Sequence, residues 1–171
     1  LEAMLLDFYC EEKIFDRVPT KEEYVAVKRK RECSLHRPIE DFAEVLPFYE
    51  RVCAITEALF APGHSEIIDA MSRLTRFLGR YAAYLVSRRE MDKALPLLER
   101  VLSLRERTHG REHPKTVNAM GALGLLHRSA GVCERGDELL ACALAMNERL
   151  FGADHPKTEY LRRCLDGGAG T

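Results

Sequence analysis

The sequence predicts an all-α fold in which antiparallel helix pairs stack into a solenoid. Three observations support this fold class. The tetrapeptide His-Pro-Lys-Thr at 113–116 recurs at 155–158, apolar residues return every third or fourth position, and Gly, Pro or Ser residues separate the apolar stretches. A helical period interrupted at a fixed interval is typical of repeat proteins, whose units bury their apolar faces only by stacking on one another.

The unit at 113–154 shows the pattern most clearly. Pro114 suits the first turn of a helix, and a break at 129–131 ends that helix. A second helix is predicted from about 134 to 151. Gly152 follows it, as Gly commonly does past a helix C-terminus. The unit is therefore expected to be one helix pair.

Residues at matching places in the units predict how neighbouring helices meet. Gly124 and Ala143 are small, so they would let the two helices of their unit approach closely. His64, His113 and His155 occupy equivalent turns, where we expect them to pack or to cap a helix. Neither these histidines nor the cysteines have the ligand spacing of a zinc site, so no metal is predicted.

An earlier unit has the same features at a longer offset, because His64 lies 49 residues before His113. The seven extra residues are about two helical turns, which would lengthen a helix while keeping its buried face nearly in phase. Helices are also expected at about 1–15, 20–35 and 39–60. The predicted organisation is an N-terminal helix at 1–19, a divergent first repeat at 20–63, a second repeat at 64–112, a third at 113–154, a half repeat at 155–166 and a flexible tail at 167–171.

Composition narrows the function classes. The 171 residues have a net charge of −1, which gives no general attraction to nucleic acid or to acidic membranes. No run of about 18 apolar residues is present, so no membrane span is predicted. We expect the six cysteines to be free, buried thiols, which favours a reducing, cytoplasmic location. The chain begins at Leu1, and we expect it to be a segment of a larger scaffold or adaptor protein.

One segment resembles the 42-residue tetratricopeptide repeats of kinesin light chains and nephrocystin-3. It reads Ala94-Leu-Pro-Leu-Leu-Glu-Arg-Val-Leu-Ser-Leu-Arg-Glu-Arg-Thr-His-Gly-Arg-Glu-His-Pro-Lys-Thr116. The resemblance extends over roughly 40–165. It implies a right-handed superhelix in which the first helix of each pair lines a concave groove that holds a peptide or a helix.

The register of that resemblance names the groove-facing candidates. They are Ser72, Arg73, Arg76 and Arg80 in the second unit, Asn118, Gly121, Ala122, Leu125 and Arg128 in the third, and Tyr160 and Arg163 in the half repeat. Where the family carries an Asn-Asn pair that grips a peptide backbone, this chain has Ser72-Arg73, Gly121-Ala122 and Arg163-Cys164. A grip different from the family's usual one is therefore predicted.

Charged runs have two interpretations each. The groove arginines would select an acidic partner segment, since arginine suits carboxylate recognition, or they form a solvated helix face with local salt bridges. The basic run at 28–31 is flanked by glutamates and lacks interleaved aromatics, so a solvated helix face is favoured over nucleic-acid binding.

The predicted function is a protein-interaction module without catalytic activity or cofactor, because no phosphate loop, nucleophile elbow or HExxH motif is present. The alternative is a structural spacer, or an autoinhibitory or self-association element beside a catalytic domain outside this chain. Because stacked repeats need caps, the half repeat is expected to leave an apolar face open at Leu161 and Leu165, which would favour homo-oligomers.

Overall fold

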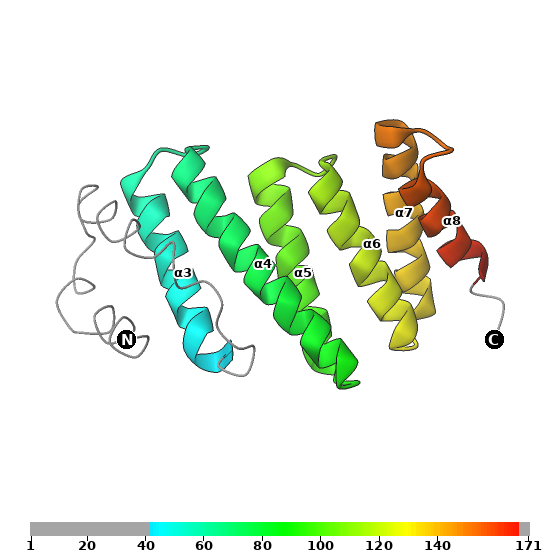
Figure 1. Ribbon diagram of the computed structural model, residues 1–171, viewed down its shortest axis with the longest axis horizontal. Coiled ribbons are helices and arrows are strands. Elements are labelled where there is room, and N and C mark those ends of the chain that lie inside the picture. Colours follow the sequence, from blue (N-terminus) through cyan, green and yellow to red (C-terminus); the bar gives the residue numbers. More distant parts are fainter. Residues whose placement is uncertain (1–41, 168–171) are drawn as a thin grey trace. The chain divides into compact units, whose positions relative to one another are not determined.

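The computed structural model describes residues 42–167 and contains six helices and no strand within that range (Figure 1). The helices predicted at about 1–15 and 20–35 lie outside these residues. Among the described helices, none combines the length and the hydropathy that a bilayer span requires. The six are α3 (Phe42–Leu59), α4 (Ser65–Ser87), α5 (Met91–His109), α6 (Pro114–Ser129), α7 (Cys133–Phe151) and α8 (Pro156–Asp166).

The chain forms two compact units, 1–74 and 75–171. In the first, the described residues are α3 and the start of α4, with a core that includes Val45, Ile55, Ala70 and Met71. The second unit contains the rest of α4 and the helices α5 to α8, in which α6 packs on α5 and α7, and α8 packs on α7.

Two apolar clusters hold the second unit together. The first joins Leu85 of α4, Ala94 of α5 and Leu126 of α6. The second joins three helices and consists of Val117, Met120, Leu140, Ala143 and Leu161. Since α6 contributes to both clusters, it is the helix that links successive layers of this unit.

The seven-residue insertion predicted in the second repeat is confirmed as a lengthened helix. α4 has 23 residues, whereas its counterpart α6 has 16. Leu78, Ala82 and Leu85 of α4 are all buried, at the i, i+4, i+7 spacing of one helix face. The two added turns therefore keep the apolar face in phase.

Glycines set the distance between α6 and α7. The predicted close approach at Gly124 is confirmed, because a Cβ there would lie 2.9 Å from Leu140 Cγ and 3.0 Å from the carbonyl oxygen of Gly136. Gly136 is the matching residue on α7, and a Cβ on it would lie 2.8 Å from the carbonyl oxygen of Gly124. Ala143 is fully buried in the same interface. The two helices thus touch backbone to backbone.

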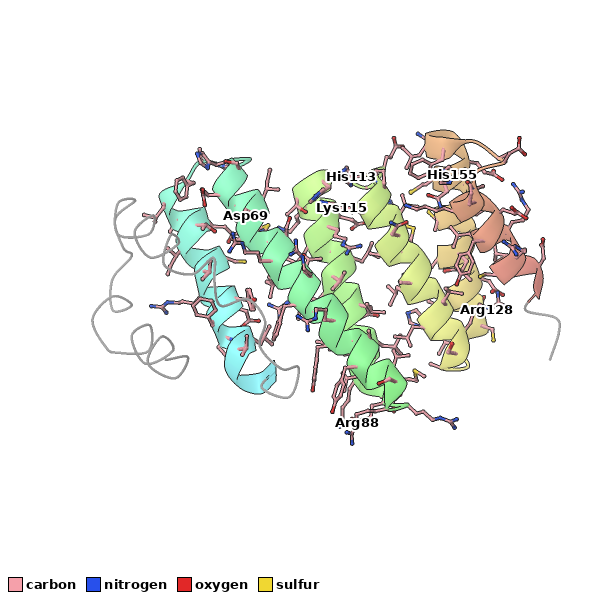
Figure 2. All side chains as sticks on the ribbon, viewed as in Figure 1. Asp69, Arg88, His113, Lys115, Arg128 and His155 are labelled. Carbon is pink, nitrogen blue, oxygen red and sulfur yellow. The ribbon has the colours of Figure 1, made fainter. Side chains whose placement is uncertain are left out.

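The repeated His-Pro-Lys-Thr motif forms the turn that starts a first helix. The Nδ1 atom of His113 accepts a hydrogen bond from the backbone N–H of Lys115 at 3.1 Å, and His155 accepts one from Lys157 at 3.2 Å. The Thr at the end of the motif is fully buried in both copies, and the Thr158 hydroxyl donates to the carbonyl oxygen of Gly152 at 2.9 Å. His113 and His155 lie at the same end of the helices (Figure 2).

These histidines also pack against the residue four positions earlier. The His155 ring stacks on Phe151 with centroids 4.6 Å apart, and His64 stacks on Phe60 at 4.5 Å. His113 meets His109 edge-on at 4.5 Å. The prediction that these histidines cap and pack at the turns is confirmed.

Replacing His155 by alanine is expected to lower the free energy of unfolding by about 1 kcal/mol, because the N-terminus of α8 loses its only side-chain cap. His155→Asn keeps a short acceptor at the N-cap and is expected to recover most of the loss. Urea unfolding of the three proteins measures both values. Equal stability of His155→Ala and wild type would show that the cap contributes nothing.

Two expectations about exposure are wrong. The half repeat does not leave Leu161 open, because α8 seats this side chain in the α6–α7 core, where it is 6% exposed, and Leu165 packs partly buried beside it. The four described cysteines are free, but only Cys53 is buried. Cys133 is exposed because it opens α7 directly after the turn, and Cys142 and Cys164 are half-buried. Cys10 and Cys33 lie outside the described residues.

Candidate partner-binding pocket

A pocket of about 360 Å³ lies between α6 and α8, with Asn147 of α7 also in its lining, entirely within the second unit. We call it the α6–α8 pocket. Five residues predicted to face a groove line it, namely Asn118, Gly121, Ala122, Leu125 and Tyr160. The remaining lining residues are Val117, Asn147, Pro156, Lys157 and Leu161.

Helical spacing explains why these residues meet. On α6, Asn118, Gly121 and Leu125 are three and four residues apart and so share one face. On α8, Lys157 and Leu161 share a face in the same way. Gly121 lets α8 come near, since a Cβ at this residue would lie 3.2 Å from Cδ2 of Leu161.

The lining is mostly apolar and contains no carboxylate. Lys157 is its single charged residue, and its Nζ lies 5.5 Å from the ring centroid of Phe151. Tyr160 is 52% exposed at the rim, and a hydrogen bond with the side chain of Cys164 raises the pKa of its phenol. The phenol is therefore a neutral group beside an apolar hollow.

Asn147 of α7 is a lining residue that sequence reasoning missed. It is 2% exposed, and its Oδ1 atom is buried without a hydrogen-bond partner. Buried polar atoms are nearly always hydrogen-bonded, so this oxygen is an exception that needs a reason. The sequence held a signal, because Arg105 occupies the equivalent place 42 residues earlier, between matched neighbours Glu106/Glu148 and Arg107/Arg149.

The two equivalent residues behave differently. In the second repeat, Nη1 of Arg105 donates a hydrogen bond to the backbone carbonyl of Lys115 at 2.6 Å, and burial lowers the pKa of this arginine. The carbonyl equivalent to that of Lys115 belongs to Lys157, which lines the pocket. In the third repeat the shorter Asn147 stands at the place of Arg105, and its Oδ1 is buried without a hydrogen-bond partner among the described residues.

Arg128 was predicted to face the groove, but its side chain is bound within the protein. Nη1 donates to the backbone carbonyl of Cys164 on α8 and lies 3.3 Å from Oδ1 of Asp137 on α7. The side chain is only 18% exposed. Arg128, labelled in Figure 2, therefore ties three helices together, and a partner would find little of its charge available.

The other predicted residues do not line the pocket. Ser72 and Arg73 belong to the first unit, where Arg73 pairs with Asp69 at 2.9 Å. Arg163 is exposed on α8, with Nε 3.9 Å from Glu159. Arg76 and Arg80 are exposed on the part of α4 in the second unit, and no ion pair joins either to a described carboxylate.

Comparisons with known proteins agree with this architecture. Residues 73–135 match one tetratricopeptide repeat family and residues 116–157 match a second. No curated protein matches the chain.

Solved structures with a similar fold include BtubC (BKLC) from P. vanneervenii, with 18% identity over 80% of this chain and 66% of that one, at a TM-score of 0.52. The chain also matches a kinesin light chain candidate from Podosopora anserina with nearly identical TPR-like repeats, with 18% identity over 86% of this chain and 64% of that one, at a TM-score of 0.48. The chain thus spans just under two thirds of the length of these structures. The two family matches and the repeated helix pairs show that residues 73–157 consist of tetratricopeptide repeats.

Proposed function

We propose that this protein-interaction repeat module binds an extended segment of a partner protein in the α6–α8 pocket. The observation that supports the proposal is the convergence of Asn118, Gly121, Leu125 and Tyr160 on one apolar hollow. Apolar pockets with a few polar groups are the usual form of binding sites, and exposed tyrosines at such a site often contribute much of the affinity.

The size of the pocket favours a side chain over a folded element. Its volume of about 360 Å³ lies near the lower end of the range for ligand sites. A partner segment would therefore insert one or two residues between α6 and α8 and pass over Tyr160 at the rim.

The charge of the partner is a second part of the proposal. Lys157 in the pocket and Arg76 and Arg80 on α4 are cations that a partner can reach, whereas Arg73 and Arg128 are paired within the protein. A segment with acidic residues on the side nearer α4 would complement them.

Peptides selected from a randomised phage-displayed library on the wild-type protein test the site. Replacing Tyr160 by alanine is expected to weaken the selected peptides by about tenfold or more, because it removes the aromatic rim while leaving the core intact. Val132→Ala, at a 48% exposed apolar residue outside the pocket, is the matched control. Failure to select any peptide, or equal loss in both variants, contradicts the proposed site.

The same peptides test the charge of the partner. The double variant Arg76→Glu, Arg80→Glu is expected to weaken acidic peptides and to reduce the salt dependence of their binding. The double variant Arg135→Glu, Arg149→Glu, at two exposed residues of α7, makes the same change in net charge and is the control. Unchanged affinity in the Arg76→Glu, Arg80→Glu variant removes the acidic partner from the proposal but leaves the pocket.

A further inference from the structure

We propose that the α6–α8 pocket recognises an uncharged amide group of the partner segment, which donates its N–H to Oδ1 of Asn147. The inference rests on the proposed function and names the chemistry of the group that enters. It depends on three observations: the unpaired oxygen, the repeat-to-repeat exchange of Arg for Asn, and the lack of a carboxylate in the mostly apolar walls.

Asn147, which carries the unpaired oxygen, is one of the residues that line the pocket. Asn147 is 2% exposed, and Oδ1 has no partner among the described residues, yet the residue lines an open hollow of about 360 Å³. A buried acceptor without a donor costs free energy that a bound donor would recover. The site is thus prepared for a ligand that brings an N–H or O–H.

The exchange of Arg105 for Asn147 explains why the hollow exists in this repeat. In the second repeat the long arginine side chain reaches the Lys115 carbonyl and satisfies it. In the third repeat the equivalent residue is the shorter Asn147, and both Asn147 and Lys157 line the pocket. The pocket therefore has room where the preceding repeat has a guanidinium group.

The walls select the kind of donor. Val117, Leu125 and Leu161 are apolar, and no carboxylate lines the pocket to accept an ammonium or guanidinium group. Lys157 further disfavours a cationic ligand. An amide is uncharged and has both a donor and an acceptor, as the Asn147 carboxamide has, so the two groups can pair in both directions.

Three small molecules with the same branched carbon skeleton serve as probes: isovaleramide, methyl isovalerate and isopentylamine. Each is titrated into the isotope-labelled full chain, and NMR shifts of the Asn147 side-chain amide and the Leu161 methyl groups report binding. Isovaleramide is expected to bind about fivefold tighter than the ester, the factor for one neutral hydrogen bond, and the ammonium compound weakest.

Two variants separate the hydrogen bond from the cavity. Asn147→Leu keeps an apolar hollow without the acceptor, so the preference for amide over ester should fall to about one. Asn147→Arg imitates Arg105, so all three probes should lose their shifts at Leu161. If either variant fails to fold, the comparison of amide and ester on the wild type still decides.

Equal binding of amide and ester to the wild type overturns the inference, as does a preference that survives Asn147→Leu. If none of the three probes changes the NMR shifts, water alone occupies the pocket at Asn147, and the inference is also overturned. The proposed function is tested separately. If library peptides bind the wild type and Asn147→Leu equally, the proposed function stands and the amide inference fails. If the amide binds but no peptide is selected, the amide subsite stands and the proposed function fails.

Discussion

Replacing Gly136 by alanine is expected to lower the free energy of unfolding by about 2 kcal/mol, through overpacking that a gain in helix propensity offsets only in part. The new Cβ would lie 2.5 Å from Arg128 Cγ, 2.8 Å from the Gly124 carbonyl oxygen and 3.0 Å from the Arg128 backbone nitrogen. Two of these atoms belong to the backbone of α6, so α6 and α7 must move apart. Thermal and urea unfolding measure the loss.

Gly79→Ala is the matched control for this substitution. Gly79 lies inside α4, and a Cβ there would have no neighbour within 4 Å. The alanine therefore gains helix propensity without crowding, and stability should rise by about 0.5–1 kcal/mol. If the two variants changed stability in the same direction, the contact between α6 and α7 would not be the limiting distance in this repeat.

Replacing Arg128 by methionine is expected to cost about 2 kcal/mol, because a partly buried carbonyl loses a charged donor. Methionine keeps most of the aliphatic stem that packs at Gly136 but cannot donate to the Cys164 carbonyl or pair with Asp137. The loss should be local, since the lost bond holds the last turn of α8. Amide hydrogen exchange is therefore expected to quicken in α8 more than in α5.

Arg76→Met provides the comparison, because Arg76 is an exposed arginine at a first-helix face and its stability change should stay within about 0.5 kcal/mol. A similar loss for both variants would mean that the clamp between α6, α7 and α8 is not specific. The pair also clarifies binding experiments, because a charge reversal at Arg128 would disturb the fold as well as any partner.

The positions of the described helices were largely predictable from the sequence. The break at 129–131, the glycine after Phe151 and the Pro at 114 and 156 are local signals, and α6, α7 and α8 begin and end within a residue or two of them. The 49-residue offset likewise predicted the longer α4. Such features succeed because capping and helical period depend on residues a few positions apart.

The candidate pocket was predictable only in part. Asn118, Gly121, Leu125 and Tyr160, which the register through α6 and α8 named, line one pocket. The same register placed Arg128 among them, whereas its side chain binds α8 and Asp137 instead. A long side chain near a helix end can reach several neighbours, and the sequence does not say which one it meets.

The sequence by itself determined the repeat period, the helix ends, the histidine caps and the membership of an all-α repeat class. Only the tertiary structure decided that Leu161 is buried, that Arg128 joins three helices and that a pocket opens at Asn147 with an unpaired oxygen. The physical reason is that exposure and pairing depend on how closely helices approach. In this chain Gly121, Gly124 and Gly136 set that distance, and its consequences appear only where α6, α7 and α8 meet.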